Sequence, residues 1–97
     1  MQLEKKYLDI ILHILQRWVP NCEVWAFGSR VHQRGLKPFS DLDLVLITKQ
    51  PLDMSLYGRL KESFSESDLP IRIDIADWSQ ISDSFKEIIR KEHEIIQ

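Results

Sequence analysis

Apolar residues recur along this chain at two spacings, and the first is typical of helices. Over residues 3–18 the apolar positions form one helical stripe, made of Leu3, Tyr7, Ile10, Ile11, Ile14 and Trp18. The same spacing predicts a helix at about 53–66 and another at about 80–91, the second capped by Ser79 or Ser82. The last helix has an apolar face that we assign to the core, formed by Ile81, Phe85, Ile88 and Ile89.

The second spacing is typical of strands and occurs in three short runs, at about 22–27, 41–48 and 71–76. The tail over 94–97 is predicted to add a short edge strand. With 97 residues and no visible linker or repeat, the chain is expected to form a single domain over 1–97. These elements predict an α/β (α+β) fold in which helices pack on one face of a small mixed β-sheet and the other face stays accessible.

The first predicted helix carries more apolar surface than one small sheet needs to cover. Leu8, Leu12 and Leu15 widen its stripe sideways. Two interpretations remain open at this point. The helix is deeply buried within the monomer, or part of its face docks on a partner protein.

Composition narrows the functional classes without choosing one. The net charge is -2 with a pI near 5.9, which argues against a general nucleic-acid binder. The single cysteine, Cys22, excludes an internal disulfide framework and is interpreted as a buried structural thiol. No apolar run approaches the length of a membrane span, and the N-terminus lacks the apolar run of a signal peptide. A cytoplasmic protein is therefore expected.

Two carboxylates lie at the N-terminal end of the second predicted strand. Asp41 and Asp43 are two residues apart, so their side chains point to one face of the strand, and Leu42 and Leu44 point to the other. Two like charges this close repel each other unless a cation lies between them. Carboxylate oxygens are the ligands that Mg²⁺ prefers, so this pair is a candidate metal site.

A tight turn precedes these carboxylates. Gly28-Ser29 ends the first predicted strand, and its backbone N–H groups and hydroxyl suit a phosphate chain, with a short helix starting after Ser29. Taken alone, Gly-Ser is an ordinary turn, and Asp-x-Asp is often a loop cap or a solvated pair. Their combination is rarer and suggests nucleotide chemistry at a metal site.

The same residues resemble the nucleotidyltransferase superfamily related to DNA polymerase beta. Its signature is Gly-Ser, a short spacer and Asp-x-Asp, which stands here as Gly28-Ser29, the spacer 30–40, and Asp41-Leu42-Asp43. A third carboxylate lies on a later strand of that superfamily, and Asp74 matches it. The whole chain is similar to the minimal nucleotidyltransferases, which are encoded beside a helical HEPN-domain partner and act as antitoxins.

The resemblance implies a Mg²⁺-dependent enzyme that transfers a nucleoside monophosphate, AMP from ATP, to a hydroxyl. Asp41 and Asp43 would bridge two Mg²⁺ ions, and Asp74 would complete the metal that holds the acceptor and take its proton. Gly28 and Ser29 would bind the β- and γ-phosphates. The interpretation of Arg30 is open: it neutralises the leaving pyrophosphate, or it is a solvated helix residue.

The acceptor implied by the resemblance is a tyrosine of the HEPN-type partner, an RNase toxin, held in a hetero-oligomer with this chain. The chain is expected to lack a domain of its own that grips the acceptor. One alternative is a nucleotide-binding module that silences its helical partner by docking, with little catalysis. A weaker alternative, transfer to a small molecule such as an aminoglycoside, generally needs a second domain.

Several residues near the predicted site receive structural interpretations. His32 is interpreted as an exposed loop residue and His93 as a surface residue. Trp25 and Phe27 are assigned to core packing, although a base-stacking role for either remains open. Asp77, just beyond the third strand, is interpreted as a turn residue.

Overall fold

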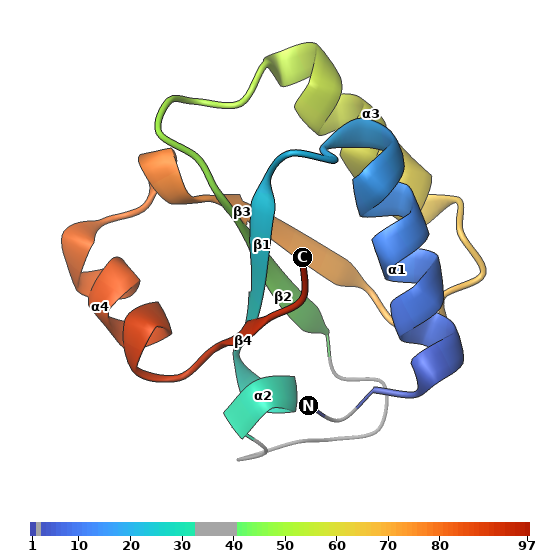
Figure 1. The fold of residues 1–97 in the computed structure, drawn as a ribbon, viewed down its shortest axis with the longest axis horizontal. Helices are drawn as coiled ribbons and strands as arrows, with labels where there is room; N and C mark the ends of the chain where they lie inside the picture. The colour runs from blue at the N-terminus through green and yellow to red at the C-terminus, as the bar shows by residue number, and fades with distance from the viewer. Residues whose placement is uncertain (2, 33–40) are drawn as a thin grey trace.

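The computed structural model describes residues 1, 3–32 and 41–97, and the predicted loop over 32–40 lies outside them except for His32. Figure 1 shows the elements in chain order: α1 (Lys5–Trp18), β1 (Glu23–Phe27), α2 (Ser29–His32), β2 (Leu42–Ile47), α3 (Met54–Ser65), β3 (Ile73–Asp77), a 3-10 turn (Trp78–Gln80), α4 (Asp83–Lys91) and β4 (Glu94–Ile95). Every predicted helix and strand is present, with boundaries shifted by a few residues. Within the described ranges, no helix has the length and apolar character that crossing a membrane requires.

The four strands form one mixed sheet in the order β3-β2-β1-β4. Strand β1 is antiparallel to both β2 and β4, whereas β2 and β3 are parallel. The tail therefore adds the predicted edge strand, and the predicted mixed sheet is confirmed. Because β2 and β3 are parallel, the N-terminal ends of both strands lie at the same end of the sheet.

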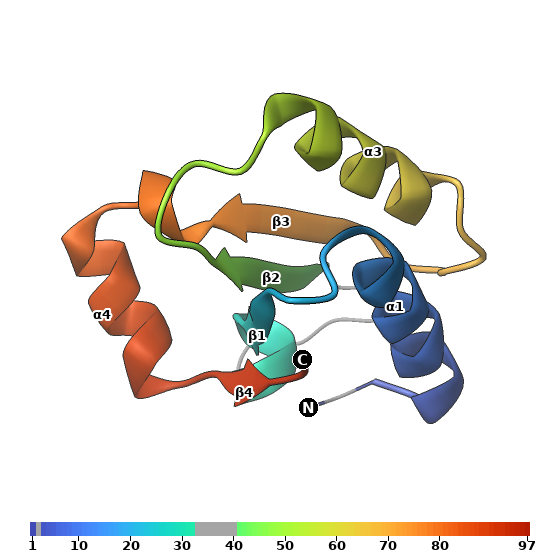
Figure 2. The same ribbon diagram turned by 45° about the horizontal axis from the view of Figure 1, so that its top comes forward.

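Two helices, α1 and α3, cover one face of the sheet (Figure 2). The buried core beneath them is formed by Ile11, Leu15, Val19, Val24, Ala26, Leu42, Leu44, Leu46, Leu60 and Phe64. Ile11 and Leu15 of α1 have no exposed surface. Among the described residues, the large exposed apolar side chains belong to other elements, namely Met54, Phe85, Ile88 and Ile95. The first of the two interpretations of α1, burial within the monomer, therefore holds for Ile11 and Leu15, whereas the rest of its predicted stripe is half-buried.

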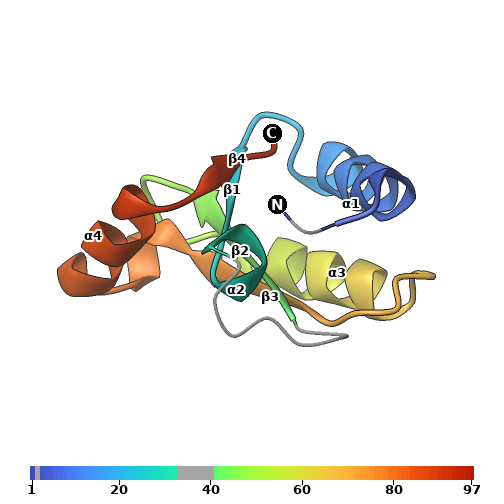
Figure 3. The ribbon, with the colours of Figure 1, turned by 90° about the horizontal axis from the view of Figure 1, so that it is seen from below.

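The fourth helix departs from the predicted arrangement. Helix α4 lies over the opposite face of the sheet from α1 and α3, as Figure 3 shows. Its Phe85 ring meets Phe27 of β1 edge-on, with centroids 5.6 Å apart. The prediction that helices pack on one face only was wrong for this element. Phe27 accordingly packs on the α4 side of the sheet and not in the main core.

His93 and Trp25 hold the end of α4 against the sheet, and both differ from their predicted roles. The sequence predicted His93 as a surface residue and Trp25 as a residue of the core. His93 is half-buried, and its ring stacks on Trp25 of β1 at a centroid distance of 4.0 Å and an interplanar angle of 13°. Its Nδ1 lies 3.0 Å from the Ile89 carbonyl oxygen. Trp25 also meets Trp78 edge-on at 5.4 Å. Aromatic contacts of this kind stabilise beyond their buried area, so these residues attach α4 to the sheet.

Asp77 connects the C-terminal ends of β2 and β3. Its carboxylate accepts hydrogen bonds from the Leu52 N–H at 2.7 Å, from the Ser79 N–H at 3.0 Å and from the Thr48 hydroxyl. Burial raises the pKa of Asp77, but these hydrogen bonds favour the charged form more strongly and leave the pKa lowered overall. The predicted turn residue thus fixes the loop after β2 to the end of β3.

We predict that Asp77→Asn lowers the free energy of unfolding at pH 7 by about 1.5–3 kcal/mol, the range for hydrogen bonds to a charged group. A carboxylate with a lowered pKa in the folded state adds stability above its unfolded pKa of about 3.9, and that stability is lost as the pH falls further. The deficit of the variant should therefore shrink at about pH 3. Urea unfolding at both pH values measures it.

Asp68→Asn is the matched control for this prediction, because Asp68 is exposed on the surface between α3 and β3. It should change the free energy of unfolding by less than about 0.5 kcal/mol. A pH-independent deficit in Asp77→Asn would contradict the assigned role of the charge.

Candidate active site

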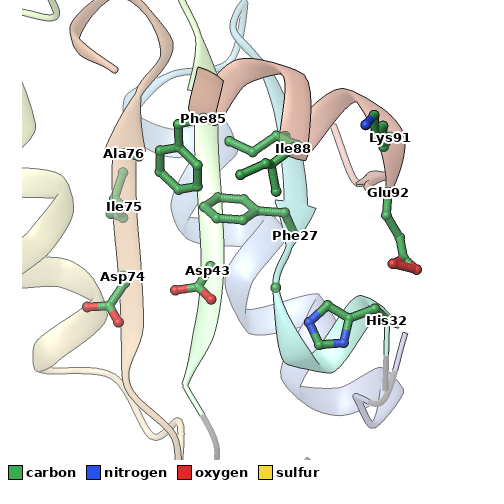
Figure 4. A pocket seen from close by; sticks show the side chains of 12 residues that line it. Phe27, His32, Asp43, Asp74, Ile75, Ala76, Phe85, Ile88, Lys91 and Glu92 are labelled. Atoms are coloured by element: carbon green, nitrogen blue, oxygen red, sulfur yellow. The ribbon is translucent and has the colours of Figure 1, made fainter. Parts of the chain in front are cut away.

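Two of the three predicted carboxylates lie side by side on the sheet face that α1 and α3 leave uncovered. In the parallel register of β2 and β3, Asp43 is the direct partner of Asp74. Asp43 points to that face because its neighbours Leu42 and Leu44 are buried in the core, and Asp74 does so because its neighbours Ile73 and Ile75 pack against that core. Figure 4 shows the two carboxylates next to each other on adjacent strands. The expected convergence is therefore present for this pair.

The third carboxylate, Asp41, is exposed and lies one residue before β2 begins. It is near enough to Asp43 to contribute to the electrostatics of that side chain. Within the ranges 1, 3–32 and 41–97, however, no group of three His, Cys, Asp or Glu side chains is arranged to hold a metal ion. Of the three carboxylates that the sequence predicts to converge, Asp43 and Asp74 thus form a close pair, and Asp41 is an exposed neighbour of that pair.

Charge and burial act on Asp43 in the same direction. Burial raises the pKa of Asp43 most, and the negative charges of Asp74 and then Asp41 raise it further. Arg72 offsets part of this charge, because its Nε lies 3.1 Å from Asp74 Oδ1. The Arg72 side chain is 76% exposed and that of Asp74 is 40% exposed, so solvent screens this ion pair. A bound cation would relieve the repulsion at Asp43 more completely.

The donor set of this site fits Mg²⁺. Carboxylate oxygens from adjacent strands are hard ligands, and Mg²⁺ is usually held by one or two carboxylates together with water and substrate phosphates. Asp43 and Asp74 would supply the protein ligands, and the exposed Asp41 is free to approach from the β2 end. Because substrate phosphates and water can supply the remaining ligands of Mg²⁺, the protein does not need to hold three carboxylates together before the substrate binds.

Gly28 stands against the carboxylate of Asp43. Its φ is +87°, a left-handed conformation that side chains disfavour. A Cβ at this position would lie 2.3 Å from Asp43 Oδ2, so the turn and the carboxylate can be this close only with glycine. The Gly28 carbonyl oxygen accepts hydrogen bonds from the N–H groups of Val31 and His32, which form the first turn of α2. Ser29 and Arg30 follow as the first residues of this helix.

A cavity of about 720 Å³ opens from the carboxylates toward α4. Its lining residues are Phe27, Gly28, His32, Asp43, Asp74, Ile75, Ala76, Phe85, Ile88, Ile89, Lys91 and Glu92. Of the described residues predicted for the site, Ser29, Arg30 and Asp41 do not line it. The prediction of His32 as an exposed loop residue was wrong, since His32 is half-buried at the end of α2 and lines the cavity.

Sequence reasoning missed the contribution of α4 to this cavity. The helical pattern assigned Phe85, Ile88 and Ile89 alike to the core. Only Ile89 is buried, with 1% exposed, whereas Phe85 is 36% and Ile88 65% exposed. An apolar side chain that faces a cavity has the same sequence pattern as one that faces the core, so periodicity could not separate them.

Comparison with known proteins agrees with this geometry. Residues 10–97 match the family described as polymerase beta, nucleotidyltransferase. A protein of Haemophilus influenzae named "Probable protein adenylyltransferase MntA" is 50% identical over 97 residues, which cover 100% of this chain and 84% of that protein.

Solved structures share the fold at low sequence identity. The crystal structure of a toxin-antitoxin with AMP-PNP has a TM-score of 0.74 and 20% identity, covering 93% of this chain and 72% of that one. The toxin-antitoxin MntA-HepT has a TM-score of 0.69 and 17% identity, covering 97% and 72%. At such identities the likeness shows the fold.

We predict that Gly28→Ala lowers the free energy of unfolding by about 1–2 kcal/mol from the left-handed conformation alone, with a further loss from the clash at Asp43. Gly58→Ala is the matched control, because Gly58 lies within α3 and a Cβ there meets no atom within 4 Å. It should raise the free energy of unfolding by about 0.4–1 kcal/mol. Urea unfolding of both variants tests the opposite signs, and equal effects would contradict the assigned role of Gly28.

Proposed function

Because this chain belongs to the polymerase beta nucleotidyltransferase family, we propose that it transfers AMP from ATP to the hydroxyl of a tyrosine on a partner protein. The chain is a nucleotidyltransferase, and the name of its relative from Haemophilus influenzae supports a protein acceptor. The observation that carries the proposal is the in-register pair of Asp43 and Asp74 beside the Gly28 turn. These two carboxylates and the glycine turn lie within one site.

The proposed reaction is an in-line displacement at the α-phosphorus of ATP. The acceptor oxygen forms a bond to this phosphorus, and the bond to the β-phosphate oxygen breaks, so that pyrophosphate leaves. When bound, Mg²⁺ supplies charge stabilisation for the attacking and leaving oxygens, as two ions do in comparable sites. Asp41, Asp43 and Asp74 would hold the metal, and Asp74, which also lines a cavity on the β3 side of the sheet, would accept the proton of the acceptor hydroxyl.

The Gly28 turn is proposed to hold the β- and γ-phosphates of ATP. The backbone of this turn lies against Asp43, so a phosphate bound at the turn and the Asp43 carboxylate would be ligands of the same Mg²⁺ ion. Ser29 adds a hydroxyl at the start of α2, and Arg30 follows with a positive charge for the leaving pyrophosphate. Glycine at this turn is what permits the close approach.

The proposed acceptor protein is a helical HEPN-type toxin encoded nearby, with which this chain forms a hetero-oligomer and acts as antitoxin. Support comes from structural neighbours that are toxin-antitoxin complexes, one of them bound to AMP-PNP. The docking-only alternative was motivated by the apolar face of α1. Because Ile11 and Leu15 of α1 are buried in the monomer, less of this apolar face is available for docking, and we favour catalysis.

The proposal predicts a gain of one AMP by the partner when both proteins are incubated with ATP and Mg²⁺, measured by intact-protein mass spectrometry. Asp43→Asn should slow this transfer by about 100-fold or more, because a lost metal ligand removes several kcal/mol of transition-state stabilisation. The variant removes a repelling charge, so its fold should persist. Asp68→Asn, an exposed change away from the site, should leave the rate unaltered.

The same variants separate catalysis from docking. Full modification of the partner by Asp43→Asn would refute the assigned chemistry. Full silencing of the partner by the double variant Asp41→Asn and Asp43→Asn, without mass gain, would favour the docking module instead. Chelation of Mg²⁺ by EDTA should stop transfer in the wild type.

A further inference from the structure

A second cavity, of about 450 Å³, follows the outer edge of the sheet between β3 and α3. In the described part of the chain, β3 has β2 on one side and no strand on the other. Figure 2 shows α3 beside β3 at this edge. The cavity is lined by residues 71–75 and by side chains of α3 that include Tyr57 and Lys61. It therefore extends along the strand and is not confined to one position.

This cavity reaches around the edge of the sheet and does not lie on one face alone. Alternate side chains of a strand point to opposite faces. Ile73 and Ile75 pack against the main core, whereas Asp74 lies on the uncovered face next to Asp43 (Figure 4). Ile73, Asp74 and Ile75 all line the cavity. Side chains of both faces can line one cavity only where it follows the edge, so the backbone of β3 is accessible from it.

The outward backbone groups of β3 are those that a further strand would use. The Leu42 N–H donates to the Arg72 carbonyl oxygen, so Arg72 and every second residue after it pair with β2. The N–H and C=O groups of Ile73 and Ile75 therefore point away from β2. The Tyr57 hydroxyl agrees with this direction, because it donates from α3 to the Ile75 carbonyl oxygen at 2.8 Å. A sheet edge with such groups can bind an extended peptide as an added strand.

The charges at this edge favour an acidic ligand. Arg72 and Lys61 both line the cavity. Arg72 shares its charge with Asp74, since its Nε lies 3.1 Å from Asp74 Oδ1. The Lys61 ammonium instead lies over the Tyr57 ring, 5.4 Å from the ring centroid, and keeps its full charge. A peptide that complements this edge therefore carries a carboxylate opposite Lys61.

We propose that β3 binds the acceptor segment of the partner protein as an added extended strand, with a tyrosine beside Asp74 and an acidic residue beside Lys61. This inference rests on the proposed AMP transfer and gives the shape and charge of its acceptor. Backbone hydrogen bonds to Ile73 and Ile75 supply affinity, and alternate side chains of the added strand supply specificity.

The two faces of the edge also fix the order of the acceptor residues. Asp74 lies on the uncovered face, whereas Lys61 belongs to α3, which covers the other face. Consecutive side chains of an extended peptide point to opposite faces. The acidic residue is therefore a direct neighbour of the tyrosine in sequence. The acceptor tyrosine of the helical partner belongs to a loop or a tail, because a helix cannot pair with β3.

The first test measures AMP transfer to short peptides by mass spectrometry, with ATP and Mg²⁺. A peptide with its tyrosine between two glutamates should have a KM about fivefold lower than the same peptide with lysines in place of the glutamates. Lys61→Glu should reverse this preference, because attraction to the glutamates becomes repulsion, and it should leave the KM for ATP unchanged. Lys49→Glu is the matched control, since Lys49 is exposed and is not among the described residues that line the cavity. It should keep the preference of the wild type.

The second test identifies strand addition by methylating the peptide backbone. N-methyl groups on every second residue remove the N–H groups along one edge of an extended peptide and leave the other edge intact. Methylation of the edge that faces β3 should lower kcat/KM about tenfold or more, because it removes hydrogen bonds and introduces clashes. Methylation in the alternate positions should leave transfer unchanged, because that edge faces solvent.

Equal loss in both methylated peptides, or equal KM for the glutamate and lysine peptides, would overturn the inference. A Lys61→Glu variant in which the KM for ATP rises and the peptide preference persists would overturn it as well. Transfer of AMP to the partner protein without transfer to any peptide would also overturn it, while leaving the proposed function intact. A wild type that modifies neither the partner nor the peptides would refute both.

Discussion

The parallel pairing of β2 with β3 is the constraint on which the site depends. It places Asp43 directly beside Asp74, and the half-buried position of Asp43 makes this repulsion costly. The sheet can maintain such a pair because alternate residues of β2, Leu42 and Leu44, are fully buried in the core. A shift of register by one residue would move the leucines to solvent and Asp43 into the core. The packing of leucines on one face of the sheet therefore fixes the position of the two carboxylates on the other face.

Strand β1 contributes to the site through its own alternation. Val24 and Ala26 are buried beneath the helices, so Trp25 and Phe27 face the opposite side together with Asp43. Trp25 stacks on His93, and Phe27 meets Phe85, so the strand both anchors α4 and lines the cavity. The strand then ends at Gly28, whose lack of a side chain lets the turn lie against the carboxylate.

Much of this arrangement could be predicted from the sequence, because it follows from local periodicity. The two-residue repeat of β2 and β3 assigns Asp43 and Asp74 to one face, and the Gly28-Ser29 break marks the turn. The position of α4 could not be predicted in this way. Phe85 and Ile88 are apolar whether they face a core or a cavity, and the stacking of His93 on Trp25 joins residues that are distant in sequence.

Asp77 shows why the remaining features depend on tertiary contacts. In sequence it is one acidic residue after an apolar run, indistinguishable from a solvated turn residue. In the structure its carboxylate binds the loop that follows β2 and the turn that follows β3. Asp43 and Asp74 are thus flanked on both sides, by the Asp77 hydrogen bonds at the C-terminal ends of their strands and by the hydrogen bond from the Leu42 N–H to the Arg72 carbonyl oxygen at the N-terminal ends. A carboxylate pair whose members repel stays in register because each strand is fixed outside the pair itself.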